Sequence, residues 1–144
     1  TQITDAGLVE VAKLQNLISL YLVKSTQFTD AGLVEVAKLQ KLTSLGLDET
    51  KITDAGLKEV AKLQKLYSLG LGYTQITDAG LKEVAKLQNL DVLNLQRTQI
   101  TDAGLKELAK LKKLRSLFLY NTQVTKAGVA ELKKALPSCN IYGP

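Results

Sequence analysis

A repeat of 24 residues constrains this chain more than any other feature of its sequence. The segment TQITDAGLVEVAKLQNL at residues 1–17 returns with small changes at residues 26, 50, 74, 98 and 122. Successive copies begin 24 residues apart, except for a first interval of 25, whose extra residue we place within residues 23–25. The sequence therefore predicts a single domain of six repeats, at residues 1–25, 26–49, 50–73, 74–97, 98–121 and 122–144.

Each repeat carries one strand signal and one helix signal. The pieces LISLYL, LTSLGL, LYSLGL, LDVLNL and LRSLFL end in a Leu-x-Leu alternation, which is typical of a short strand with one buried face. Segments such as TDAGLKEVAKL predict helices of roughly ten residues that begin after a capping threonine, and the aspartate that follows it suits the helix dipole. One strand and one helix cannot enclose a core, so the repeats must stack on one another.

The stacking geometry follows from the spacing of the elements. A strand that returns in parallel through a helix does so with a right-handed crossover. Neighbouring strands lie ~4.8 Å apart, whereas packed helices need ~8–10 Å, so the helical side must spread. We therefore predict an α/β solenoid, right-handed and curved, with a parallel β-sheet on the concave face and short α-helices on the convex face.

The pattern LxxLxLxxTxITDAGLxxLAxL covers the whole chain and resembles the leucine-rich repeat superfamily. The likeness is to repeats of bacterial leucine-rich repeat proteins and, more distantly, to F-box substrate receptors. That family usually has asparagine at one turn position where this chain has threonine, and we expect the threonine hydroxyls to satisfy neighbouring backbone groups. These threonines are Thr50, Thr74, Thr98 and Thr122. The resemblance implies that binding residues lie on the exposed positions of the concave strands.

Those exposed strand positions vary from repeat to repeat, whereas the helix positions recur almost unchanged. Aromatic residues stand at both ends of the predicted concave face, and Gly46, Gly70 and Gly72 are expected to leave a bare notch between them. Tyrosine and arginine favour binding hot spots, so we predict a surface that binds a protein or a peptide. The candidate residues are Tyr21, Val23, Asp48, Gly70, Gly72, Tyr73, Asn94, Gln96, Arg97, Phe118 and Tyr120.

Two other functions stay open at this point. The near-identical units also fit a structural scaffold or spacer, or a consensus-like repeat without a ligand of its own. Residues 97–144 carry nine Lys and Arg against three Asp and Glu, a balance that attracts nucleic acid or an acidic partner. Six lysines of the chain, however, follow a helix glutamate by three residues, which is typical of a solvated helix face. We therefore do not expect nucleic acid binding, and only Arg97 and Arg115 remain near the concave face.

The sequence gives little support for catalysis. Histidine is absent and Cys139 is the only cysteine, which excludes most hydrolase triads, the usual zinc sites and an internal disulfide. We predict a non-enzymatic protein without catalytic residues, metal or cofactor, and we interpret Cys139 as a packed thiol. Asp48, Asn94 and Gln96 are not expected to bind a cation, because we place two strands between them. No apolar stretch approaches the ~18 residues of a membrane-spanning helix.

The two ends of the chain differ. Pro137 should stop the last helix, and Ile141 aligns with Leu117 as a final strand residue, which together predict a C-terminal cap. The first repeat has no comparable cap, because Ile3 and Leu8 need an apolar neighbour. We interpret this as a fragment of a longer protein, or as a site of end-to-end self-association.

Overall fold

The structure is a computed structural model that describes residues 2–144; Thr1, where the first predicted repeat begins, lies outside the described residues. Short strands and helices alternate along the chain. The helices are α1 (Asp5–Val11), α2 (Asp30–Val36), α3 (Asp54–Val60), α4 (Asp78–Val84), α5 (Asp102–Leu105), the 3-10 helix η1 (Lys106–Lys110) and α6 (Lys126–Ala135). The strands are β1 (Ser19–Tyr21), β2 (Ser44–Gly46), β3 (Ser68–Gly70), β4 (Val92–Asn94), β5 (Ser116–Phe118) and β6 (Asn140–Tyr142).

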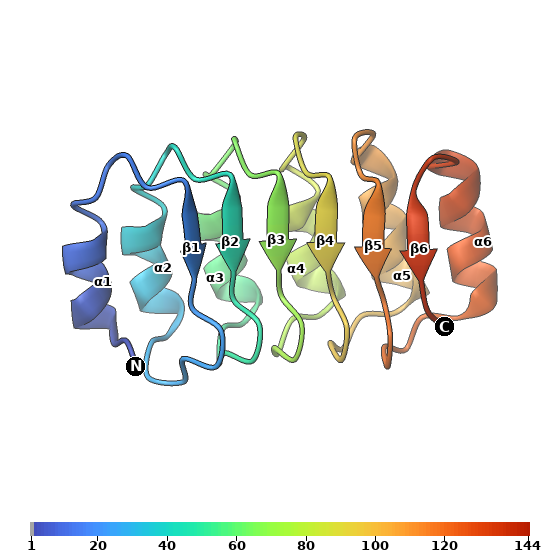
Figure 1. Cartoon of the computed structure of the whole chain (residues 1–144). Helices are drawn as coiled ribbons and strands as arrows, with labels where there is room; N and C mark the ends of the chain where they lie inside the picture. Colours follow the sequence, from blue (N-terminus) through green and yellow to red (C-terminus); the bar gives the residue numbers. More distant parts are fainter. Residues whose placement is uncertain (1) are drawn as a thin grey trace.

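The strands form one open, parallel sheet in the order β1-β2-β3-β4-β5-β6, with the helices along one face (Figure 1). The central residues of the strands lie in one row: Leu20, Leu45, Leu69, Leu93, Leu117 and Ile141. This register confirms the α/β leucine-rich repeat solenoid and the pairing of Ile141 with Leu117. The right-handed crossover and the curvature stay predictions.

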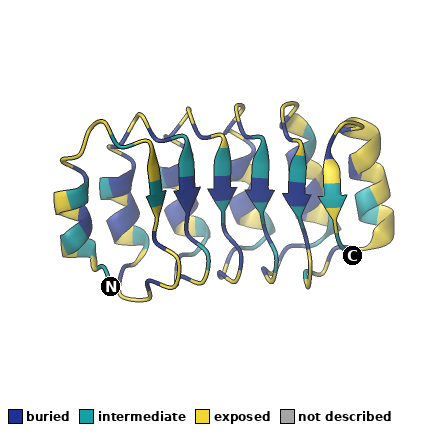
Figure 2. Ribbon diagram, viewed as in Figure 1, coloured by how far each residue is buried: buried dark blue, intermediate teal, exposed yellow. Residues whose placement is uncertain are grey.

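The core lies between the sheet and the helices. In the third repeat, Leu57 from α3 and Leu69 from β3 are each 1% exposed, and Leu66 is fully buried. The same positions are buried in the neighbouring repeats, so that one continuous apolar layer runs along the solenoid (Figure 2). Full burial of a leucine side chain contributes about 1.5–3 kcal/mol. The leucine period therefore supplies both the pattern and most of the stabilisation.

The predicted place of the extra residue in the first repeat is wrong. Lys24 has a φ of 62° and Glu49 has a φ of 57°, so the two turns match through these residues. Buried Ser25 then matches Thr50, and buried Phe28 matches Ile52. Two exposed residues separate Ser25 from Phe28, whereas only one separates Thr50 from Ile52. The insertion therefore lies at residues 26–27, where the backbone bulges into solvent, and not within residues 23–25.

Helix α6 has the predicted ten residues, but α1–α4 are shorter and contain seven each. A glutamine side chain closes the end of each of these four: in the third repeat, Gln64 Nε2 donates to the carbonyl of Ala61 at 2.6 Å. The fifth repeat has Lys112 in place of this glutamine. There the helix divides into the four-residue α5 and the 3-10 helix η1.

The turn threonines satisfy backbone carbonyl groups, as predicted. Each hydroxyl donates to the carbonyl of the leucine three residues earlier, at 2.6–2.7 Å, so the bond lies within one repeat. The pairs are Thr50–Leu47, Thr74–Leu71, Thr98–Leu95 and Thr122–Leu119.

A carboxylate at the start of each of the helices α1–α5 joins neighbouring repeats. Asp54 accepts hydrogen bonds from the backbone N–H of Thr77 at 2.8 Å and from its hydroxyl at 2.5 Å. The Thr77 hydroxyl in turn accepts from the N–H of Ala79 and caps α4. A Cβ on Gly80 would collide with Asp54 Oδ1. The same contact joins Asp5–Thr29, Asp30–Thr53, Asp78–Thr101 and Asp102–Thr125.

This Asp–Thr contact explains why the motif TDAG recurs, and it gives the first prediction. Asp54→Ala should lower the free energy of unfolding by about 2 kcal/mol, because the N–H and hydroxyl of Thr77 lose their charged acceptor. Glu59→Ala is the matched control: it removes the exposed 2.7 Å ion pair with Lys62 and should cost at most about 0.5 kcal/mol. Urea unfolding measures both changes. Equal losses in the two variants would contradict the role of the Asp–Thr contact.

Candidate binding surface

The face of the sheet away from the helices, here called the open sheet face, carries the predicted binding residues. Tyr21, Gly70, Asn94 and Phe118 lie in strands β1, β3, β4 and β5. The other seven candidates lie in the turns directly after β1–β5. They are Val23, Asp48, Gly72, Tyr73, Gln96, Arg97 and Tyr120.

The turns after the strands share an unusual backbone conformation. One residue in each turn has a positive φ of 52–62°, although none of them is glycine. In the third repeat this residue is Tyr73, whose N–H donates to the carbonyl of Gln96 at 2.9 Å. The inter-repeat ladder therefore continues past the ends of the strands. The equivalent residues are Lys24, Glu49, Tyr73, Arg97 and Asn121.

Aromatic side chains gather on the C-terminal half of this face. The Phe118 and Tyr142 rings stack with their centroids 4.8 Å apart. Tyr120 is 48% exposed beside them, and the Arg97 guanidinium lies 5.1 Å from the centroid of the Tyr73 ring. Sequence reasoning missed Tyr142 as a surface residue, although the alignment of Ile141 with Leu117 places Tyr142 opposite Phe118.

The predicted notch at the glycines is wrong, because neighbouring side chains fill it. The Tyr21 ring covers Gly46, where an added Cβ would lie 2.6 Å from a ring carbon. Asp48 covers Gly70 so closely that a Cβ there would collide with its carboxylate. At Gly72 a Cβ would lie 2.9 Å from both Asp48 and Asn94. The glycines therefore give room to these side chains, and the face is continuous.

Asp48 and Asn94 meet across this glycine pair. Asp48 Oδ1 accepts hydrogen bonds from Asn94 Nδ2 at 2.7 Å and from the N–H of Gly72 at 2.9 Å. The expected separation by two strands is wrong, since β3 alone lies between β2 and β4. Burial raises the pKa of Asp48 and outweighs the lowering by these hydrogen bonds. The folded state therefore holds a proton on Asp48 more tightly than the unfolded chain does.

Other kinds of site find little support in residues 2–144. In this part of the chain no three His, Cys, Asp or Glu side chains are grouped so that they could hold a metal ion. No helix of the described residues is long and apolar enough to cross a membrane. Cys139 is fully buried, and burial raises the pKa of its thiol, as expected of a packed cysteine.

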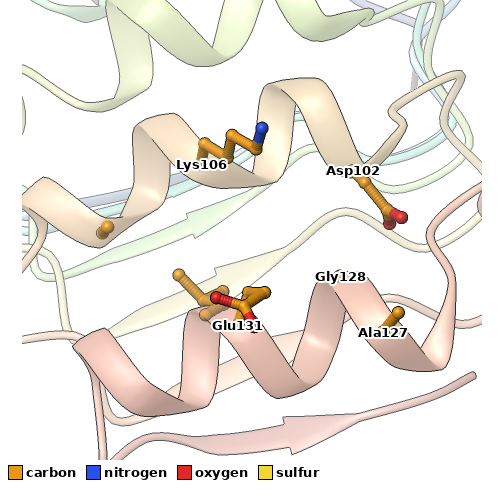
Figure 3. Close-up of a pocket in the computed structure, with 7 residues that line it drawn as sticks. Asp102, Lys106, Ala127, Gly128 and Glu131 are labelled. Atoms are coloured by element: carbon orange, nitrogen blue, oxygen red, sulfur yellow. The ribbon is translucent and has the colours of Figure 1, made fainter.

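A groove of about 610 Å³ lies on the helical side, between η1 and α6 (Figure 3). Ala109 and Leu132 contribute its apolar walls, and Lys106 and Glu131 lie along it. Asp102 points toward the start of α6, where its carboxylate accepts from Thr125. The carboxylates of the groove are engaged with threonine and lysine.

Comparison with known proteins identifies the family. A family model described as Leucine Rich repeats (2 copies) matches residues 88–134, and a second, Leucine Rich repeat, matches residues 38–61. Together with the repeat register and the open parallel sheet, these matches show that the chain is a leucine-rich repeat protein. No curated protein sequence matches it significantly.

Solved structures with this fold include bacterial proteins. Internalin C2 from Listeria monocytogenes is 26% identical, with a TM-score of 0.73 over 99% of this chain and 60% of its own. Internalin inlF from the same organism is also 26% identical, with a TM-score of 0.65 over 94% of this chain and 45% of its own. A Leptospira interrogans leucine-rich repeat protein is 28% identical, with a TM-score of 0.62 over 92% of this chain and 38% of its own.

This chain therefore spans less than two thirds of the length of each of these structures. Their bacterial sources agree with the predicted resemblance to bacterial leucine-rich repeat proteins. The more distant resemblance to F-box substrate receptors stays a prediction.

The contact between Asp48 and Gly70 gives the second prediction. Gly70→Ala should lower the free energy of unfolding by about 1–2 kcal/mol, because the new methyl group must displace the hydrogen-bonded carboxylate. In an Asp48→Ala background the same change should cost less than about 0.5 kcal/mol, because the obstacle is gone. Thermal and urea unfolding of the four chains completes the cycle. An equal cost of Gly70→Ala in both backgrounds would show that Asp48 does not occupy this space.

Proposed function

We propose that this chain binds a protein or a short peptide through its open sheet face and does not catalyse a reaction. The supporting observation is the group of exposed aromatic side chains over the C-terminal strands. Tyr120 is 48% exposed and Tyr142 is 39% exposed, beside the ring stack with Phe118. Rigid aromatic side chains give a large contact area at a small cost in conformational entropy.

The remainder of the open sheet face suits an extended ligand. Its residues change between repeats at several positions, as in Tyr21, Asn94 and Phe118, although serine recurs at the first position of four strands. The Asp48–Asn94 pair is held by hydrogen bonds and presents polar atoms between the aromatic residues. Backbone groups of the strands are already paired within the sheet, so recognition would depend on side chains. This arrangement supports a peptide lying across β3–β6.

The size of the face agrees with a peptide more than with a globular partner. Six strands spaced ~4.8 Å apart, each ~10 Å wide, give a floor of roughly 290 Å², well below the ~800 Å² per side of a standard interface. A globular partner would have to contact the turns as well. The alternative of a scaffold or consensus-like repeat without a ligand predicts no binding at all, which makes it testable.

The third prediction addresses this proposal. Peptides selected from a random displayed library against the wild-type chain should lose about tenfold or more in affinity for Tyr120→Ala, because an aromatic anchor is removed. Val34→Ala is the matched control, since Val34 is a similarly exposed apolar residue on α2. Isothermal titration calorimetry measures both variants. If no peptide can be selected, or if every selected peptide binds the Tyr120 variant as tightly as the wild type, the proposal fails.

End-to-end self-association is a second candidate property, favoured by the apolar side chains of the first repeat. Leu14 is 56% exposed, whereas its equivalent Leu39 is fully buried under the preceding repeat. Ile18 is 57% exposed, and Tyr21 on the edge strand β1 is 66% exposed. The first repeat, with α1 and β1, lies at the N-terminal end of the solenoid (Figure 1). We propose that a second copy of the chain covers these side chains.

The fourth prediction tests this end contact. Light scattering coupled to size exclusion should show a molecular mass that rises with protein concentration, because apolar area is removed from water on association. The variant Leu14→Glu/Ile18→Glu should remain monomeric, because carboxylates would then be buried in the contact. Val34→Glu places the same charge on α2 and should associate like the wild type. A wild-type chain that stays monomeric over the whole concentration range would rule out the contact.

A further inference from the structure

A second column of variable, partly exposed residues lies directly before the strands, at the opposite end from the Tyr73–Arg97 turns. Backbone hydrogen bonds fix this column: the N–H of Asp91 donates to the carbonyl of Tyr67, and the N–H of Arg115 donates to the carbonyl of Asp91, both at 2.8 Å. The column contains Ile18, Thr43, Tyr67, Asp91 and Arg115, so its chemistry differs in every repeat. It therefore varies in the same way as the open sheet face.

A hollow of about 690 Å³ lies over this column, with lining residues from Thr43 in the second repeat to Ser138 in the sixth, and is here called the basic hollow. It contains four cationic side chains and one carboxylate. Tyr67 is 53% exposed at the same place. The residues that define the basic hollow are Lys65, Tyr67, Asp91, Lys112, Lys113 and Arg115.

The positive charge of the basic hollow is largely uncompensated. On the helices, a glutamate neutralises one lysine in each repeat at 2.6–2.9 Å, as the sequence predicts. Within residues 2–144, by contrast, Lys65, Lys112 and Lys113 take part in no ion pair. Lys113 donates instead to the neutral amide oxygen of Asn89 at 2.7 Å. This hydrogen bond therefore positions the Lys113 side chain and leaves its positive charge unneutralised.

Asp91 offsets only part of this charge. Its carboxylate lies 3.5 Å from Nε of Arg115, whose side chain is 75% exposed. On the other side, Asp91 accepts a hydrogen bond from Tyr67 and thereby raises the pKa of that hydroxyl. The carboxylate thus holds Arg115 and Tyr67 in place, and the outer face of the guanidinium is open to a second anion.

Lys112 departs from a structural pattern that the earlier repeats keep. In those repeats this position is glutamine, whose amide closes the helix end: Gln40 and Gln88 donate to the carbonyls of Ala37 and Ala85 at 2.6 and 2.8 Å. The fifth repeat gives up this amide contact and places a cation at the rim of the basic hollow. A scaffold alone does not require that exchange.

We propose that the basic hollow docks an acidic segment of a protein partner, whose aspartate or glutamate side chains pair with Lys65, Lys112, Lys113 and Arg115. This surface is separate from the open sheet face. Charge complementarity favours such a segment, because electrostatic pairing increases both specificity and the rate of association. Nucleic acid fits less well: the row continues into neutral Thr43 and Ile18, so the cations do not form a track for a phosphate backbone.

The fifth prediction uses residues that other repeats already carry at these positions. Lys112→Gln, Lys113→Asn and Arg115→Thr, combined in one chain, should preserve the fold and remove three charges from the basic hollow. The probe is a fluorescein-labelled octapeptide of alternating Asp and Glu, with its Asn/Gln counterpart as the uncharged reference. Fluorescence anisotropy should show the acidic probe binding about tenfold more weakly to this variant than to the wild type. Binding to the wild type should also weaken between about 50 and about 200 mM NaCl.

A matched control separates the basic hollow from net charge. Lys58→Gln, Lys82→Gln and Lys106→Gln remove the same charge from the helices and should change the affinity less than about twofold. Equal losses in the two triple variants would overturn the proposal, as would failure of the wild type to bind the acidic probe. A single-stranded oligothymidine of similar length is the last arm. If it binds the wild type more tightly than the peptide does, the surface is a nucleic-acid site and the proposal is wrong.

Discussion

The contact between an aspartate carboxylate and the capping threonine of the next helix holds the stack of repeats in register. It requires aspartate at the first position of one helix, threonine at the N-cap of the next, and a glycine three residues after that threonine. A larger residue at the glycine would displace the carboxylate, and a threonine without its acceptor would leave two donors unpaired. These linked requirements explain why the TDAG motif recurs while the strand positions vary.

The outward residues of the open sheet face take no part in the Asp–Thr contact, and this freedom makes that face suitable for recognition. Its strands are held by backbone hydrogen bonds and buried leucines, so the outward side chains can change without loss of the fold. Asp48 and Asn94 use this freedom in an unusual way, because they meet across Gly70 in β3 and Gly72 in the turn directly after it. The result is a continuous surface with polar atoms in the middle and aromatic rings toward β6.

The distribution of charge is equally structured. Lys110 and Lys134 are neutralised by glutamates of the same helix, so only part of the basic composition of the last third contributes to the charge of the helical side. Positive charge gathers before β3–β5, where Lys112 replaces a helix-closing glutamine, while Arg97 lies in the turn after β4. The turns of the open sheet face follow the strands, whereas the column under the basic hollow precedes them. A single partner could therefore contact both surfaces only by lying along the strands.

Much of the fold could be predicted because the 24-residue period and the Leu-x-Leu spacing leave one way to bury the leucines. That pattern determined the strand register, the pairing of Ile141 with Leu117 and the positions of the candidate residues, and it also predicted the Glu–Lys pairs within helices. The sequence alone did not determine which side chains meet between repeats. The filling of the space over Gly46 and Gly70, the Asp48–Asn94 contact, the basic hollow and the place of the insertion depend on rotamers and on distances between residues of different repeats. Only the tertiary structure decided these features, because a periodic sequence specifies that repeats stack but not how far a side chain reaches into the next one.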